Sequence, residues 1–128
     1  MEVITTDNAP AAIGPYSQAV KAGDFLFCSG QIGIDPHTKK LAGDNISTQT
    51  EQVLKNLRAV LNASGLDLED IVKTTVFLKN MDDFPVVNDI YGKEFGSHKP
   101  ARSTVGVARL PLNGLIEIEC IAACRKPS

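Results

Sequence analysis

The sequence IVKTTVFLK at residues 71–79 alternates between two sets of side chains with a period of two. The first set is Val72, Thr74, Val76 and Leu78, and the second is Ile71, Lys73, Thr75, Phe77 and Lys79. Alternation in a run this rich in β-branched residues is typical of a strand. We therefore predict a β-strand here, and the segments on either side of it define the rest of the fold.

A helix is predicted on each side of this strand. The first begins with capping-box spacing at Thr48 and ends near Gly65. The second is capped by Asp82, accepts Pro85 in its first turn and ends at Gly96. Apolar residues gather on one face of each helix, at Val53, Leu54, Leu57, Val60 and Leu61 in the first and at Phe84, Val87, Ile90 and Tyr91 in the second.

Four more strands are predicted, as a hairpin of residues 17–21 and 25–28 and as two strands at 102–109 and 116–119. The resulting order is β-β-α-β-α-β-β, which predicts a single α+β domain over residues 1–128 with both helices on one face of the sheet. The other face also carries apolar residues, and nothing else in the chain can cover it. We therefore expect self-association through the sheet as a symmetric homo-oligomer.

Composition excludes several classes of protein. The 128 residues suffice for one ordinary core, and a net charge of −2 gives no general attraction to nucleic acid. The three cysteines, Cys28, Cys120 and Cys124, are odd in number and lack CxxC spacing, so we expect no disulfide framework and no zinc site. We expect a cytoplasmic protein, with a mitochondrial location left open, and no export or membrane segment.

Arg102 and Glu117 are the candidate catalytic residues. An arginine fork suits a carboxylate ligand, and the residues alternating with Arg102 on its strand, including Thr104 and Gly106, are small enough to leave space beside it. Glu117 and Glu119 share one strand face, where a carboxylate can orient a water next to an activated electrophile such as an imine. The alternative for each is a structural ion pair at an edge or an interface.

Four further residues are candidates for a binding pocket. Tyr16 follows a rigid Gly-Pro turn, Ser29 and Gly30 offer a hydroxyl and a close backbone approach, and Asn88 interrupts the buried stripe of the second helix. The alternative explanations are ordinary packing for Tyr16, a turn for Ser29 and Gly30, and surface exposure for Asn88, and for the first three residues these are the more usual ones. The histidines have no partners at metal-ligand spacing and no nucleotide-binding glycine loop is present, so we expect neither a metal nor a cofactor.

Taken together, six blocks of this sequence resemble the reactive intermediate deaminase (Rid) family, formerly called YjgF-type, and its RidA branch in particular. The blocks are residues 9–19 (APAAIGPYSQA), 29–32 (SGQI), 72–77 (VKTTVF), 87–91 (VNDIY), 100–103 (PARS) and 116–119 (IEIE). They extend over nearly the whole chain in the order and spacing of the family.

The resemblance implies a chorismate-mutase-like subunit with a mixed sheet, and a homotrimer with a central β-barrel and three clefts between subunits. It implies cofactor-free hydrolysis of 2-imino acids, such as 2-iminobutanoate and 2-iminopropanoate, to 2-keto acids and ammonia. Arg102 matches the arginine that grips the substrate carboxylate, and Glu117 the residue that positions the water. Tyr16, Ser29, Gly30 and Asn88 match pocket residues. Thr104 stands where many members have cysteine and Gly106 where an acid is common, which leaves substrate preference open.

The competing interpretation is a regulatory or binding protein that uses the same cleft, because relatives are associated with RNA cleavage, translation inhibition, chaperone-like activity and transcriptional control. The chain has no basic run and no Trp, so it lacks the stacking platform and positive groove that single-stranded nucleic acid needs. A small-molecule sensor without turnover also fits the sequence.

Overall fold

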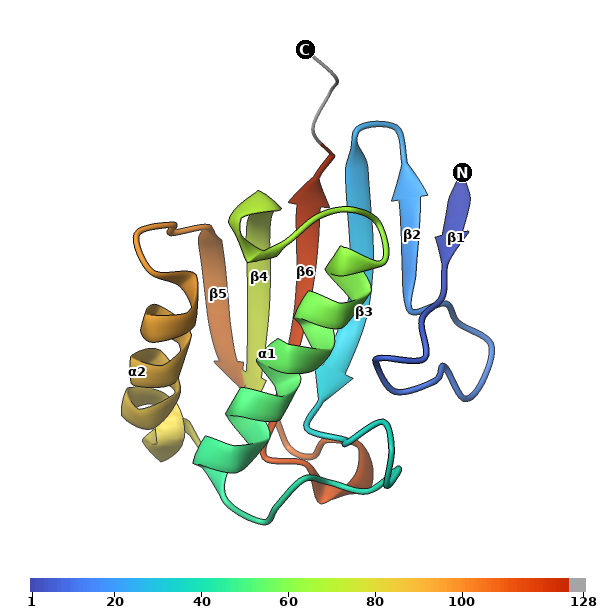
Figure 1. Cartoon of the computed structure of the whole chain (residues 1–128). Helices are drawn as coiled ribbons and strands as arrows, with labels where there is room; N and C mark the ends of the chain where they lie inside the picture. Colours follow the sequence, from blue (N-terminus) through green and yellow to red (C-terminus); the bar gives the residue numbers. More distant parts are fainter. Residues whose placement is uncertain (125–128) are drawn as a thin grey trace.

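The structure is a computed structural model that describes residues 1–124. Its strands are β1 (Glu2–Ile4), β2 (Ala19–Ala22), β3 (Phe25–Ile32), β4 (Ile71–Leu78), β5 (Ala101–Gly106) and β6 (Ile116–Ala123), and its helices are α1 (Ile46–Asn62) and α2 (Phe84–Phe95). The strands form one sheet in the order β1-β2-β3-β6-β4-β5, and both helices lie on the same face of it (Figure 1). The expected α+β domain with two helices on one face is confirmed, and the last four residues of the predicted 1–128 span lie outside the described part.

The sheet is mixed, because β4 and β5 are parallel and all other neighbouring strands are antiparallel. A parallel pair needs a crossover, which here is the segment containing α2. The hairpin of β2 and β3 was predicted from sequence. The strand β1, which pairs with β2, was missed because three residues are too few to show a period.

The alternation predicted for residues 71–79 holds from Lys73 onward but not before it. A β-bulge at Val72 interrupts the pairing of β4 with β6, so that Ile71 joins Thr74 and Val76 on the helix-covered face. All three are fully buried, whereas Val72 is exposed. The extra residue of the bulge moves Ile71 to the face opposite the one predicted.

Two predicted helix caps are wrong and the two predicted ends are confirmed. The side chain of Asn45, not Thr48, caps α1, by accepting a hydrogen bond from the Thr48 backbone N–H at 2.9 Å. Asp82 lies in a short 3₁₀ turn before α2, which begins without a side-chain cap. Gly65 and Gly96, with φ of +76° and +62°, follow α1 and α2 in the left-handed conformation that glycine tolerates.

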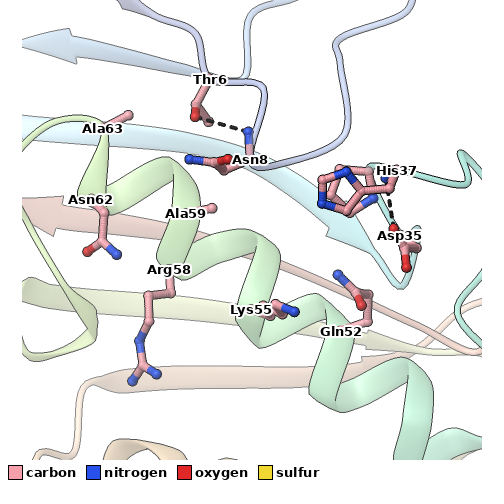
Figure 2. A pocket seen from close by; sticks show the side chains of 11 residues that line it. Thr6, Asn8, Asp35, His37, Gln52, Lys55, Arg58, Ala59, Asn62 and Ala63 are labelled. Carbon is pink, nitrogen blue, oxygen red and sulfur yellow. Dashed lines mark hydrogen bonds between the residues drawn. The ribbon is translucent and has the colours of Figure 1, made fainter.

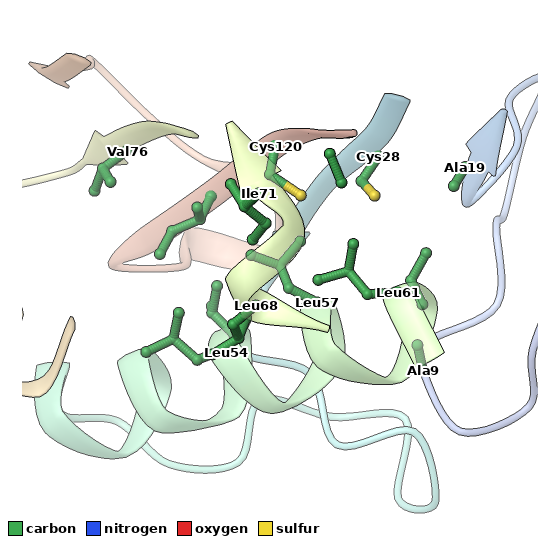
Figure 3. Packing of buried hydrophobic residues seen from close by; sticks show 14 of the residues in the cluster. Ala9, Ala19, Cys28, Leu54, Leu57, Leu61, Leu68, Ile71, Val76 and Cys120 are labelled. Atoms are coloured by element: carbon green, nitrogen blue, oxygen red, sulfur yellow. The ribbon is translucent and has the colours of Figure 1, made fainter. Parts of the chain in front are cut away.

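The core lies between the sheet and the two helices. Figure 3 shows Leu54, Leu57 and Leu61 of α1 pointing toward the strands that carry Cys28 and Cys120. Burying each leucine contributes about 1.5–3 kcal/mol to stability. Neither helix in residues 1–124 is long and apolar enough to span a membrane.

The face opposite the helices has no cover within the described chain. Four large apolar side chains on it or at its bulge, Phe25, Phe27, Val72 and Val105, remain 42–46% exposed. Two glutamates, Glu117 and Glu119, also lie on this face. We call it the open face of the sheet.

Candidate functional site

Arg102 lies on β5, the edge strand that follows α2. In the parallel pairing with β4 it is aligned with Thr74, a fully buried residue of the helix-covered face. Its guanidinium meets α2, where the carbon Cζ lies 4.9 Å from the ring centre of Tyr91 and 5.3 Å from that of Phe84. At these distances the face of an aromatic ring attracts a cation. The rings therefore hold the guanidinium at the edge of the sheet, where Arg102 remains exposed to solvent.

A hollow of about 470 Å³ opens beside Arg102. Its other lining residues come from α2 and the turn after it, and are Asn88, Tyr91, Gly92, Phe95, Gly96, His98, Lys99 and Pro100. The small neighbours of Arg102 on its own strand, which were expected to leave this space, do not line it. None of the ion pairs found among residues 1–124 includes Arg102. The guanidinium is therefore available to an anionic ligand.

Thr104 lies two residues further along β5 and is aligned with buried Val76, on the same face as Arg102. Its Oγ1 is buried and has no hydrogen-bond partner within the described residues. A buried hydroxyl without a partner is rare in folded proteins. The strand thus carries two polar groups with unused hydrogen-bonding capacity, Arg102 and Thr104.

Glu117 lies on β6 between Ile116 and Ile118, which are both fully buried under the helices. Its side chain therefore points to the open face, together with that of Glu119. Burial raises the pKa of the Glu117 carboxyl above its usual value, and the negative charge of Glu119 raises it further. A carboxylate with a raised pKa is a better proton acceptor near neutral pH than an exposed one.

Gly30 lies within the irregular stretch of β3 between Cys28 and Gln31, directly against Glu117. A Cβ added to Gly30 would lie 2.8 Å from the carboxyl carbon of Glu117 and even closer to one of its oxygens. The bulge and the missing side chain together leave room for the carboxyl group. The structure therefore brings together two of the predicted residues, Gly30 and Glu117.

Ser29 precedes Gly30 on β3, and Tyr16 lies in the segment before β2. The Ser29 hydroxyl donates to the Ser17 carbonyl at 2.6 Å, so its proton is already used in the fold. Tyr16 follows a tight turn in which its N–H donates to the Gly14 carbonyl at 2.9 Å, and its side chain is 54% exposed. The Ser29 bond ties the segment that carries Tyr16 to β3.

Arg102 and Glu117 do not meet within a single chain. Arg102 is on the helix-covered face of the edge strand β5, and Glu117 is on the open face of β6, with β4 between the two strands. The predicted residues thus form two half-sites. We call them the arginine half-site (Asn88, Arg102 and Thr104) and the glutamate half-site (Tyr16, Ser29, Gly30 and Glu117).

A second hollow, also of about 470 Å³, lies between the N-terminal segment, the loop after β3 and the outer side of α1 (Figure 2). Its polar groups are largely used in the fold. Asp35 accepts from the His37 backbone N–H at 2.8 Å, which lowers the pKa of the Asp35 carboxyl. Arg58 points away from Asn8 and pairs with Asp67 at 3.0 Å. We therefore do not place the site here.

The two histidines lie on different elements and do not form a shared site. His37 is exposed in the loop after β3, and the His98 Nε2 is 2.7 Å from the Ile71 carbonyl oxygen. Among residues 1–124, no three His, Cys, Asp or Glu side chains gather in an arrangement that could hold a metal ion.

The aromatic platform under Arg102 was missed by the sequence analysis. Phe84 and Tyr91 were assigned only to the hydrophobic face of α2. Their spacing of seven residues places both on the same side of a helix, and that side packs toward the strand carrying Arg102. This spacing is a signal that was present in the sequence but requires knowing which strand lies beside α2.

Comparisons with known proteins agree with this architecture. The family model described as Endoribonuclease L-PSP matches residues 6–124. A 2-iminobutanoate/2-iminopropanoate deaminase of Salmonella typhimurium is 51% identical over 97% of this chain and 98% of its own length. The chloroplastic Reactive Intermediate Deaminase A of Arabidopsis thaliana is 54% identical over 94% of this chain and 65% of its own.

The fold comparison extends this likeness to the whole subunit. The crystal structure of the YjgF gene product of Escherichia coli superposes with a TM-score of 0.93 at 48% identity, covering 98% of this chain and all of that one. Both the sequence match and the structural match thus extend over almost every described residue. The chain therefore belongs to the Endoribonuclease L-PSP family, and its resemblance to the reactive intermediate deaminases is confirmed.

Proposed function

We propose that the protein hydrolyses reactive 2-imino acids, such as 2-iminobutanoate and 2-iminopropanoate, to 2-keto acids and ammonia without a cofactor, and so limits the damage these imines cause. The relative from Salmonella typhimurium carries the name of this activity. The observation that carries the proposal is the unpaired guanidinium of Arg102, held against two rings beside a hollow. A small substrate with a carboxylate is the ligand that suits it.

Arg102 binds the substrate carboxylate through two parallel N–H···O bonds. A charge-assisted hydrogen bond of this kind contributes about 1.5–3 kcal/mol. Because the imine carbon is bonded directly to the carboxylate carbon, fixing the carboxylate also fixes the reacting atom. Positioning of this type supplies much of the acceleration in a reaction whose electrophile is already activated.

Glu117 acts on the attacking water. The oxygen of the water adds to the iminium carbon while the C=N electron pair moves to nitrogen, and Glu117 accepts the released proton. Glu117 then returns this proton to the nitrogen. The C–N bond breaks and its electron pair leaves with the nitrogen as ammonia. The ammonia takes up the proton of the hydroxyl group and departs as ammonium. Iminium and water thus become keto acid and ammonium, with Glu117 unchanged. The raised pKa of the Glu117 carboxyl supports its part as proton acceptor and donor.

The site is shared between copies of the chain. Arg102 and Glu117 lie on opposite faces of one sheet, so one small substrate can meet both only if they come from different chains. The exposed apolar side chains of the open face support association through that face, including Phe25 and Phe27. A homotrimer with a central barrel, as the family resemblance implies, would bury this face.

The remaining pocket residues complete the two half-sites. Thr104 offers a buried hydroxyl without a partner, and Asn88 lines the hollow beside Arg102. Gly30 leaves room for the Glu117 carboxyl, and Ser29 holds the segment that carries Tyr16 in place. The exposed phenol of Tyr16 is then free to close over the substrate.

A trapping assay tests the proposal. A pyridoxal-phosphate dehydratase generates 2-iminobutanoate in the presence of semicarbazide, and the protein competes with semicarbazide for the imine. We expect the wild type to lower the yield of the trapped product and Arg102→Ala to lose this effect. Arg109→Ala is the matched control, because Arg109 is an exposed arginine outside both half-sites, and it should behave as wild type.

Two outcomes would contradict the proposal. Unchanged trapping by the wild type with a range of imino acids would exclude the deaminase. Salt-sensitive cleavage of RNA that survives Arg102→Ala would favour the activity in the family's description, for which the net charge of −2 and the half-sites give no support.

A further inference from the structure

Arg102 is an exposed side chain, yet its charged end has a defined environment. A long arginine at the edge of a sheet samples many rotamers, and binding a ligand then requires ordering it. Here the guanidinium carbon lies 4.9 Å from the ring centre of Tyr91 and 5.3 Å from that of Phe84. The rings favour one placement of the guanidinium before any ligand arrives.

Tyr91 is itself held at its polar end. Its hydroxyl forms a 2.7 Å hydrogen bond with Oγ1 of Thr74, a buried residue of β4 that is aligned with Arg102 in the neighbouring strand. Burial raises the pKa of the Tyr91 hydroxyl, so it stays neutral, and either hydroxyl can be the donor in this bond. The bond ties the ring to the strand beside the one that carries Arg102.

The ring of Tyr91 also stacks on a second aromatic ring of α2. It stacks on Phe95 with ring centres 4.4 Å apart and planes at 27°, and Phe95 in turn lies 6.3 Å from the ring of His98. The row ends where His98 Nε2 lies 2.7 Å from the Ile71 carbonyl oxygen. Hydrogen bonds therefore join both ends of this row of rings to β4. The guanidinium of Arg102 lies over the ring of Tyr91, the first ring of the row.

The hydroxyl groups of this pair are not needed for packing. Valine at 74 and phenylalanine at 91 would fill nearly the same volume, and a buried hydroxyl is unfavourable unless it is hydrogen-bonded. What the hydrogen bond adds is a fixed position for the hydroxyl end of the Tyr91 ring, while the stack on Phe95 restrains the ring plane. A ring held in this way offers a fixed surface to the guanidinium of Arg102, which lies over it.

We propose that Tyr91, tethered by Thr74, is a positioning residue that orients the Arg102 guanidinium for the substrate carboxylate. This inference rests on the proposed role of Arg102 as the carboxylate anchor. Tyr91 itself does not contact the reacting atoms. It affects the reaction only through Arg102.

Two readouts test it, and the first is independent of activity. In protein labelled with ¹⁵N at arginine, relaxation of the Arg102 Nε–H reports how ordered the guanidinium is, since a rigid group has a high order parameter. We expect Arg102 to be ordered in the wild type and disordered in Tyr91→Leu. The second readout is binding of pyruvate, a 2-keto acid that presents the same carboxylate, for which Tyr91→Leu should raise Kd about two- to fivefold. The KM for the imino acid should rise by a similar factor, with a smaller change in kcat.

Paired variants separate the tether from packing. Tyr91→Phe combined with Thr74→Val removes both hydroxyls without leaving either unpaired and keeps the ring, so it tests the tether even if Tyr91→Leu does not fold. We expect it to lower the order of Arg102 Nε–H and to weaken pyruvate binding less than Tyr91→Leu does. Leu26→Val, a buried change on β3, which β6 and β4 separate from the strand of Arg102, is the control that lowers stability without moving either readout.

The outcomes keep this inference apart from the proposed function. Arg102 order and pyruvate binding that are unchanged in both Tyr91 variants would overturn the positioning role. So would a loss in Leu26→Val equal to that in the Tyr91 variants, because the effect would then follow stability. If Arg102→Ala retained full deaminase activity, the proposed function would fail, while the relaxation experiment would still decide whether Tyr91 orders Arg102.

Discussion

The two half-sites carry opposite charges in opposite environments. Arg102 is exposed and rests on aromatic rings, whereas Glu117 is partly buried against a glycine and beside a second carboxylate. An arginine stays charged in any environment, so its surroundings need only to orient it. A glutamate must have its proton affinity adjusted, and burial is the means of raising its pKa. Under the proposed function, this difference suits one half-site to binding and the other to proton transfer.

The largest expected effect is that of Glu117→Gln. It removes the proton acceptor but keeps the size and polarity of the side chain, so kcat should fall by about 10²- to 10⁴-fold while pyruvate still binds. Arg102→Ala should do the reverse and raise the Kd for pyruvate about 10- to 100-fold. Turnover kinetics and calorimetry of pyruvate binding check both. Equal effects of both variants on binding would remove the distinction between the half-sites.

Mixing the two inactive variants tests whether the half-sites belong to different chains. If Arg102→Ala and Glu117→Gln chains assemble together, about a quarter of the sites receive an intact arginine from one chain and an intact glutamate from the other. Activity should therefore rise well above that of either variant alone after joint refolding. No recovery in a preparation shown to contain mixed oligomers would mean that each site is built by one chain.

The split between the half-sites also shows what the sequence could and could not predict. The period of β4 from Lys73 onward, the helix stops at Gly65 and Gly96, and the shared face of Glu117 and Glu119 were read correctly, because each depends on local geometry. The relative faces of Arg102 and Glu117 could not be predicted, because alternation within each strand gives no information about how two strands align. Only the pairing of both with β4 defines that register.

The errors have equally specific causes. Val72 looked like an ordinary member of an alternating strand, and nothing local marks it as the extra residue of a bulge. Asn45 and Thr48 are both good helix caps, and they are three residues apart. Tyr91 was assigned to the core because a buried aromatic residue on a helix face is usually only that. The trimer, the cytoplasmic location and the roles of the site residues remain predictions.

A smaller effect is expected from Gly30→Ala, which acts on the glutamate half-site alone. The new methyl group would occupy the space of the Glu117 carboxyl, which must move. We expect kcat to fall about tenfold with little change in pyruvate binding, since a displaced catalytic group loses its geometry. In the Glu117→Gln background the same substitution should have almost no further effect on kcat. An additive loss would show that Gly30 acts on something other than the carboxyl of Glu117.

The smallest expected effect is on stability, and its sign follows from the raised pKa of the Glu117 carboxyl. The folded protein holds this proton more tightly than the unfolded chain, so protonation of Glu117 stabilises the fold. This stabilisation is lost as the pH rises from the usual glutamate pKa through the raised one. At neutral pH the partly buried charge then destabilises the fold. We expect Glu117→Gln to raise Tm at pH 7 by a few degrees at most and to leave it nearly unchanged at pH 4.

The control for this measurement is Glu51→Gln, because Glu51 is an exposed glutamate on α1. The Tm of this variant should differ little from that of the wild type at either pH. A lower Tm for Glu117→Gln at pH 7 would mean that the Glu117 carboxylate stabilises the fold, as a structural ion pair at an interface would. Such a result would assign Glu117 to structure and leave only the arginine half-site as functional. A higher Tm joined to a lost kcat would instead show a charge that is kept for chemistry at the expense of stability.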